Sequence, residues 1–411
     1  MNGDLIAYLS GNIPGGIYLL LVGIVAFAVI WWLVWHGTKF WNVSRFFMAL
    51  MLGWVIITGV YVIAWRRSQP PPLPIRVVVS ADDSGDHPKN WRLTGLEDII
   101  GRRLDASAKH FVLQRSTIIP LLNRSGFDEA RMDSLAFRLR AHWLVTVLTR
   151  DDGPGAGMSV KVKKRDHGGF KLIAVLPVNE GRFCAEGAKI SGEVARLLGD
   201  DAAPKARFGL PMNLPDRAFA DLYTAMELRR IQAYDSAITV FSGLTQSYPG
   251  WHRPYQELAA THLVHFGSYR KETIHSLLIT ALELDPSDPE SYILMGRLFL
   301  RFCDWVEAEA ALKLALNQTV DDPRIFYYLS KLGRERLKDL PYGGRNELKY
   351  RALELAPGYE DARLSLAESY RDLLDRYNSV AVLEEGLAID PESVPLLLSK
   401  AANLVEMGYN D

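Results

Sequence analysis

Two apolar runs without a charged side chain, residues 17–35 and 46–65, open the chain and are 19 and 20 residues long. A helix rises about 1.5 Å per residue, so each run could cross the hydrocarbon layer of a bilayer, which is about 30 Å thick. The pattern predicts a transmembrane hairpin over residues 17–67 behind a tail of residues 1–16, and hence contact with the lipid bilayer and a multi-pass location in a bacterial inner membrane. The runs begin at Ile17 and Phe46 and end at Trp35 and Trp65.

The first run could also be read as a cleaved signal peptide. The residues before it contain no Lys or Arg, and Trp31 and Trp32 stand where cleavage would require small residues, which favours a retained helix. Lys39 and Arg45 favour a cytoplasmic loop, which would make the C-terminal domains periplasmic, whereas the basic pair that follows the second run argues for the opposite orientation.

Residues 68–74 are rich in proline and predict an extended, semi-rigid stalk. Strand and helix patterns then alternate up to residue 200. The expected strands are 75–80, 110–114, 144–149, 158–164 and 170–176, and the expected helices are 96–107, 116–123, 128–142 and 184–198. This order favours an α/β domain with a mixed sheet over residues 75–200, followed by a linker over residues 201–215.

A family resemblance follows from these residues. Its signals are the strand Phe111-Val112-Leu113 leading into Arg115-Ser116, the turn at Gly126-Phe127, and the helix end Leu139-Arg140-Ala141-His142 that enters Leu144-Val145-Thr146-Val147. This pattern resembles the TolB amino-terminal-like module, which is similar to FlgO and curli-assembly domains. The resemblance implies an α/β module next to tetratricopeptide repeats. Arg140 stands where the family usually has glycine, and Leu148-Thr149 stands where it has Gly-Ser.

Residues 216–411 carry a repeat instead of strand patterns. The repeat-closing positions Pro249, Pro286, Val320, Pro357 and Pro391 are 37, 34, 37 and 34 residues apart. Such a period, with small and large apolar residues at fixed places, is typical of tetratricopeptide (TPR) repeats, and it predicts five repeats and the first helix of a sixth. In the third unit, Gly296 and Ala308 are small where paired helices approach, and Tyr292 and Phe299 fill the seam.

The first helices of stacked repeats line a concave surface that accepts a peptide or a partner helix. Several positions on this predicted surface are basic, which suggests an acidic partner, although an ordinary solvated helix face is an equally good reading. The candidate partner-binding residues are Arg229, Arg253, Arg297, Arg301, Lys331 and Arg334.

No pattern of side chains predicts catalysis, a cofactor or a metal. His262 and His265 lie one helical turn apart, but His262 takes a seam position in the repeat, which favours a packed histidine. The acidic loop around Asp82 and the glycine-rich turn around Gly155 lack the spacing of calcium and phosphate sites. The chain has 47 basic and 48 acidic residues, so composition gives no support for nucleic acid as a partner.

Cys184 and Cys303 are the two cysteines of the chain, and we expect both to be buried as small hydrophobic residues, with a disulfide between them left open. Two functions remain. The first is a non-catalytic, membrane-anchored adaptor that binds proteins of a cell-envelope complex. The second is the sensory arm of a signalling system that captures a ligand through the α/β domain and the repeats. The absence of a cyclase or DNA-binding domain favours the adaptor.

Overall fold

By its contacts the chain divides into two compact units, residues 1–72 and 73–411, and every element described below belongs to the second. The computed structural model describes residues 75–81, 91–105, 110–113, 129–149, 157–179, 181–200, 211, 213–265, 270–319, 322–337, 342 and 344–409.

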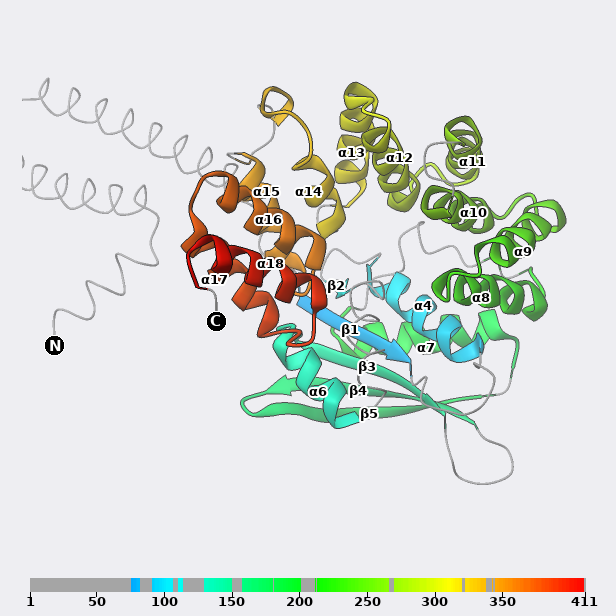
Figure 1. Ribbon diagram of the computed structural model, residues 1–411. Coiled ribbons are helices and arrows are strands. Elements are labelled where there is room, and N and C mark those ends of the chain that lie inside the picture. Colours follow the sequence, from blue (N-terminus) through cyan, green and yellow to red (C-terminus); the bar gives the residue numbers. More distant parts are fainter. Residues whose placement is uncertain are drawn as a thin grey trace, which may run out of the picture. The chain divides into compact units, whose positions relative to one another are not determined.

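The described strands form one five-stranded mixed sheet in the order β2-β1-β3-β4-β5 (Figure 1). β1 lies parallel to β2 and β3, whereas β4 runs antiparallel to its two neighbours, β3 and β5. In the centre of the sheet, Val79 is paired with Val145, and Val145 with Val162. The strands are β1 (Ile75–Ala81), β2 (His110–Leu113), β3 (Trp143–Thr149), β4 (Met158–Asp166) and β5 (Gly169–Val178).

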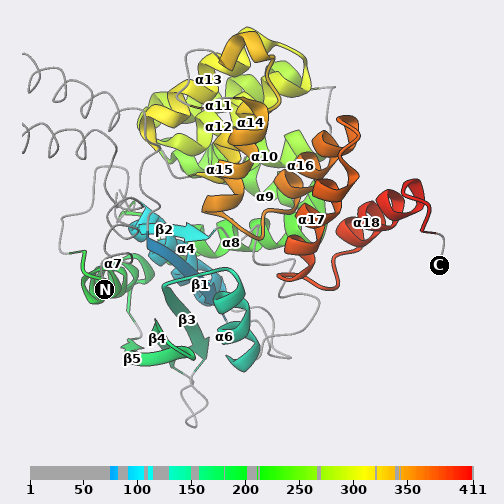
Figure 2. The ribbon, with the colours of Figure 1, turned by 90° about the vertical axis from the view of Figure 1, so that its left-hand side faces the viewer.

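Alternation along β1 divides the core between the two faces of the sheet. Val77 and Val79 belong to a cluster with buried residues of α4 (Trp91–Asp105) and α7 (Phe183–Leu197). Val78 points the other way, because successive side chains of a strand alternate, and belongs to a cluster with α6 (Glu129–Arg138). Figure 2 shows α6 and α7 on opposite sides of the sheet.

After residue 215 the described elements are all helices, and successive α-helices pack against each other. They are α8 (Asp216–Arg230), α9 (Tyr234–Ser247), α10 (His252–His265), α11 (Lys271–Leu284), α12 (Pro289–Arg301), α13 (Trp305–Gln318), α14 (Pro323–Leu329), the short 3-10 helix η3 (Arg334–Leu337), α15 (Arg345–Leu355), α16 (Glu360–Asp372), α17 (Arg376–Leu387) and α18 (Val394–Glu406). The predicted domain boundaries and the number of repeats stay predictions.

Local sequence explains where several of these helices begin. The side chains of Asp288, Asp322 and Ser393 each accept a hydrogen bond from a backbone N–H of the first turn. A proline stands within the first two positions of the same three helices, where its missing N–H costs no hydrogen bond. Pro289 and Pro323 therefore start α12 and α14 rather than interrupt them.

Glycine allows the close approach between α12 and α13 that the repeat pattern predicts. A β-carbon at Gly296 would lie 2.6 Å from Leu312, which is fully buried. Ala308 and Ala315, on the same side of α13, are fully buried as well. The small residue at position 296 is thus required by the packing of this helix pair.

The five predicted strands are all present, and their ends differ from the prediction by at most two residues. The predicted helix 128–142 ends earlier, at Arg138, because Arg140 adopts a left-handed conformation with φ 56°. The N–H of Ala141 donates to the carbonyl of Ala136 at 2.9 Å, which closes the helix as a Schellman turn does. The predicted helix 116–123 lies outside the described residues.

None of the described helices is both long and apolar enough to cross a membrane. This finding corrects the predicted fold class of a membrane-anchored α/β + α protein with two transmembrane helices. The described part of the chain supports a mostly helical fold with one small mixed sheet. The predicted multi-pass inner-membrane location, with periplasmic domains, is corrected on the same finding. The apolar runs 17–35 and 46–65 lie outside the described residues.

The α/β elements and the repeats share two hydrophobic clusters. Ile99 of α4 and Phe183 of α7 cluster with Phe219 and Phe241 of the first helix pair. At the other end, Val78 and Leu113 belong to one cluster with residues of α14, α15 and α16. The Arg76 side chain of β1 also donates through Nε to the carbonyl oxygen of Leu355 at 3.1 Å. The α/β part is therefore in contact with the first helix pair through α4 and α7, and with the later repeats through the sheet.

Replacing Gly296 with alanine should lower the free energy of unfolding by about 1–3 kcal/mol, because the added methyl group overlaps Leu312 in a closely packed seam. Gly243, in the middle of α9, has no atom within 4 Å of an added β-carbon. Gly243→Ala is therefore the control, and it should stabilise the protein by about 0.5–1 kcal/mol. Urea unfolding measures both variants, and equal effects would contradict the packing argument.

Replacing Arg140 with glycine should raise the free energy of unfolding by about 1 kcal/mol, because glycine adopts the left-handed conformation without the steric cost of a side chain. The matched control is Arg138→Gly, two residues earlier and within α6. It should lower the free energy by about 1 kcal/mol through the poor helix propensity of glycine. Thermal unfolding followed by circular dichroism distinguishes the two directions.

Candidate peptide-binding groove of the helical repeats

The first two candidate residues, Arg229 and Arg253, bind carboxylates of the chain itself. Arg229 pairs with Glu257 at 2.7 Å, and Arg253 pairs with Glu257 at 2.8 Å and with Asp98 of α4 at 3.2 Å. Burial acts to lower the pKa of Arg253, but the carboxylates of Asp98 and Glu257 outweigh it and raise that pKa above its usual value. Both arginines thus stabilise contacts inside the molecule.

Arg297 and Arg301 are in a different situation. Both lie on α12, and neither forms an ion pair within the described part of the chain. Arg297 is half-buried and lines a cavity, whereas Arg301 is the exposed last residue of the helix. The structure therefore separates two arginines that look equivalent in sequence.

Lys331 and Arg334 do not lie on a first helix, because α14 ends at Leu329. The Ser330 hydroxyl donates to the carbonyl of Tyr327 at 2.6 Å, and Gly333 follows, and both features disfavour continuation of a helix. Lys331 donates to the Ser365 hydroxyl at 3.0 Å and lies over the ring of Tyr327. Arg334 begins η3.

A cavity of about 380 Å³ lies along α12, α14, α16 and the start of α18, which are first helices in the predicted repeats. Its wall is half apolar. The apolar part includes Ile293, Tyr328 and Tyr359, and the polar part includes Arg297 and Asp361. Burial raises the pKa of both tyrosines, so their hydroxyl groups remain protonated donors at neutral pH. The cavity can accept an apolar side chain next to a charged one.

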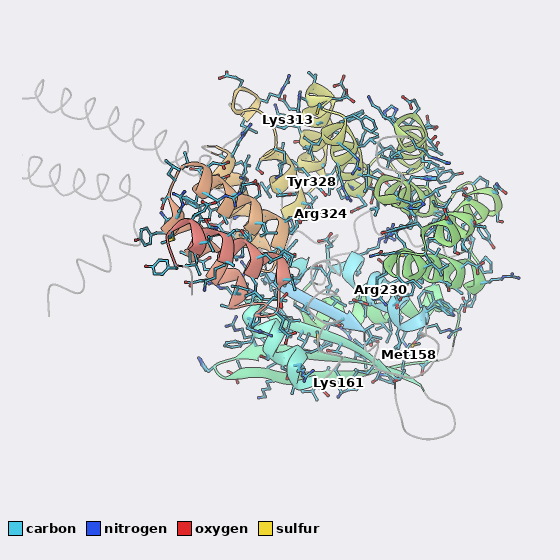
Figure 3. All side chains as sticks on the ribbon, in the orientation of Figure 1. Met158, Lys161, Arg230, Lys313, Arg324 and Tyr328 are labelled. Atoms are coloured by element: carbon cyan, nitrogen blue, oxygen red, sulfur yellow. The ribbon has the colours of Figure 1, made fainter. Side chains whose placement is uncertain are left out.

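Arg324 is the central charge of this wall and was not predicted from the sequence. It pairs with Glu290 at 2.6 Å and with Asp322 at 2.8 Å. Burial acts to lower its pKa, and the two carboxylates together raise it well above the usual value. Arg324 and Tyr328, one turn apart, both extend from α14 (Figure 3).

A repeat-based signal could have revealed this pair. Glu290 and Arg324 are 34 residues apart, as are Lys331 and Ser365. Each bond therefore joins positions of consecutive units that are one common repeat length apart. Comparing opposite charges at that separation would have identified Glu290 and Arg324, whereas the search for exposed basic positions did not.

A smaller cavity, about 300 Å³, lies beside Lys331, Leu364 and Arg371. Ser365 belongs to its wall, and the carbonyl of Ser365 accepts a hydrogen bond from the ammonium group of Lys349 at 2.9 Å. Burial, with the neighbouring charges of Lys331 and Arg345, lowers the pKa of Lys349 to about 8. The charge of Lys349, which is bonded to Ser365 of this cavity wall, therefore changes at mildly alkaline pH.

The other sites considered from the sequence give no constellation of ligands. His262 is buried, and burial lowers its pKa, while the His265 ring lies 3.3 Å from a carboxylate oxygen of Asp235. Among the described residues, no group of three or more His, Cys, Asp or Glu side chains could hold a metal. Asp82 and Gly155 lie outside the described residues.

The two cysteines differ from expectation in one respect. Cys184 is buried, as predicted, whereas Cys303 is exposed. Cys303 follows the end of α12 in a left-handed conformation with φ 58°, which turns the chain toward α13 and leaves the side chain outside the seam. Both are free cysteines in the structure.

The lowered pKa of Lys349 should make the free energy of unfolding depend on pH. The folded protein releases this proton at pH about 8 and the unfolded chain at about 10.5, so the unfolded state binds more protons between these values. The free energy of unfolding of the wild type, relative to Lys349→Met, should therefore rise over this range, by about 3 kcal/mol at most. Urea unfolding at pH 7.5 and pH 10 tests this, and parallel profiles would contradict a lowered pKa.

Neither a protein-family model nor a curated protein matches this sequence. Several solved structures match in part. A thermophilic TPR protein from Thermus thermophilus is 18% identical over 46% of this chain and 99% of its own, with a TM-score of 0.39. Yeast Tom70 is 16% identical over 54% of this chain and 50% of its own, with a TM-score of 0.38. The pilF protein of Pseudomonas aeruginosa is 14% identical over 48% of this chain and 87% of its own, also with a TM-score of 0.38.

The tetratricopeptide part of the predicted resemblance agrees with the succession of helix pairs. It also agrees with the bonds Arg324–Glu290 and Lys331–Ser365, each of which joins residues 34 positions apart. The TolB-like module stays a prediction.

Proposed function

We propose that this chain is a non-catalytic adaptor that binds a segment of a partner protein in the cavity along α12, α14, α16 and α18. The observation that carries the proposal is Arg297. It is half-buried in the cavity wall and forms no ion pair among the described residues, while Arg324 in the same wall is neutralised by Glu290 and Asp322. A half-buried cation without an ion-pair partner among the described residues favours a ligand that supplies the anion.

The rest of the wall defines the partner segment. Ile293, Tyr328 and Tyr359 provide apolar surface, and an extended or helical peptide can place one apolar side chain on it. An acidic side chain one or two positions away would then reach Arg297. The proposed ligand is therefore a short peptide segment that combines an acidic residue with a bulky apolar one.

A second function is favoured by the contacts between α4 and the first repeats. The predicted TolB-like module would act as a sensory arm, in which the binding of a ligand changes the conformation of the helical repeats. The ion pair between Asp98 and Arg253 joins the two parts directly and supports such communication. The adaptor remains the function that the groove itself favours.

The test compares two charge reversals on the same helix. Arg297→Glu changes the cavity wall, and Arg301→Glu makes the same change at an exposed position one turn later. Peptides are first selected on the full-length wild-type protein from a displayed random library, and the best are measured by fluorescence anisotropy. Arg297→Glu should weaken their binding about tenfold or more, because a charge-assisted hydrogen bond is replaced by repulsion.

The control should bind within about twofold of the wild type, a difference well below 1.4 kcal/mol. Selected peptides should be enriched in Asp or Glu near an aromatic or branched apolar residue. Selection of basic peptides, or equal loss in both variants, would refute the groove as the binding site. Circular dichroism of both variants verifies that the helices remain intact.

A further inference from the structure

A second cavity, about 280 Å³ in volume, lies between α4 and the inner helices of the first repeats. Its wall combines residues of α4 with residues of α8, α10, α12 and α14, and with Val79 and Leu113 from the strands. It shares only Leu294 and Arg324 with the cavity of the proposed peptide groove. The space is just below the usual range for drug-sized ligands, so it suits a smaller molecule.

Three ion pairs account for most of the charge in this wall. Asp98 is paired with Arg253, Glu257 with Arg229, and Glu290 with Arg324. Arg102 of α4 also lines the cavity and is half-buried, but within the described residues it has no carboxylate at ion-pair distance. Glu97 and Asp105 are the other two charged residues of the wall, so Arg102 is its one arginine without a carboxylate at ion-pair distance among the described residues.

A polar side chain on the opposite wall has an unused acceptor. Gln256 of α10 is 1% exposed, and its amide nitrogen donates to the Ser291 hydroxyl at 2.7 Å and to the carboxylate of Asp288. These two acceptors fix the orientation of the amide. Its Oε1 atom receives no hydrogen bond in the structure. A buried acceptor without a donor is costly, and a ligand N–H group can supply the donor.

The wall also has an apolar side. Val79, Leu113 and Leu294 are buried residues on its inner side, and Met226 and Ala260 contribute from the repeats. Such a surface takes an aliphatic or thioether side chain and gives little to a strongly polar molecule. The cavity therefore offers an anion site, a hydrogen-bond acceptor and an apolar wall in one small volume.

We propose that this cavity binds an apolar α-amino acid, with its carboxylate on Arg102, its ammonium group donating to Gln256 and its side chain against Val79, Leu113 and Leu294. The zwitterion suits a wall in which paired guanidinium and carboxylate groups stand side by side. The site is a separate cavity that shares only Leu294 and Arg324 with the peptide groove, so it assigns a second kind of ligand to the chain.

Isothermal titration calorimetry of the full-length protein tests the proposal with L-valine, L-leucine, L-isoleucine, L-methionine and L-phenylalanine as probes. At least one should bind. For an L-leucine ligand, isoamylamine lacks the carboxylate and 4-methyl-2-oxopentanoate lacks the N–H donor, so each should bind about tenfold more weakly or worse. Absence of heat with all five amino acids up to millimolar concentration would overturn the proposal, as would equal binding of the amino acid and both analogues.

Two variants locate the ligand. Arg102→Gln removes the proposed anion site without breaking an ion pair among the described residues, and it should weaken binding about tenfold or more. Arg301→Gln makes the same change at an exposed residue of α12 and should leave affinity unchanged. Ala260→Leu fills part of the cavity and keeps all of its charges, so it should also weaken binding. Binding that survives both Arg102→Gln and Ala260→Leu would place the ligand elsewhere and refute this site.

Discussion

At Gly95, helix α4 lies so close to its neighbours that an added β-carbon would stand 2.5 Å from Phe183 and 2.7 Å from Tyr223. This approach brings Asp98, one turn later, to the hydroxyl of Tyr223 at 3.0 Å and to the guanidinium group of Arg253 at 3.2 Å. The second cavity, the pairing of Arg253 and the shared cluster around Phe183 all depend on it. Desolvation offsets much of the attraction in a largely buried ion pair, so the close packing at Gly95 contributes more to this contact than the charge pair does.

Periodicity predicted the parts of the fold that depend on nearby residues. The strands follow from runs of β-branched residues, and the helix pairs follow from a spacing that keeps small residues such as Gly296 in the seams. The end of α6 was missed because Arg140 takes a conformation that local preference assigns to glycine. The contact of α4 with the repeats had no sequence signal, since Asp98 and Arg253 are 155 residues apart and neither belongs to a recurring pattern.

The candidate site could be predicted only in part, because periodicity reflects nearby residues and not contacts between distant ones. The basic residues were identified by their place in the repeat, but whether such a residue is available depends on what lies opposite. Arg253 faces carboxylates, one of them supplied by α4, whereas Arg297 faces a cavity. Lys331 lies past the end of a helix that is only 7 residues long, because Ser330 and Gly333 interrupt the expected pattern. Sequence periodicity predicts which face of a helix a residue occupies, but not which residues of other elements lie opposite that face.

The bond from Arg76 to the carbonyl of Leu355 joins residues that are 279 positions apart. In an ordinary repeat array each unit contacts only its neighbours, so the terminal units fray and unfolding spreads inward from them. Here the α/β part touches the first repeat through α4 and a later repeat through Arg76, so the units between these contacts have no free end. Their unfolding is tied to that of the sheet, which makes the array behave less like a linear chain of weakly coupled units and more like a single cooperative domain. The same long-range closure raises the contact order, and folding should accordingly be slower than in an open array of this length.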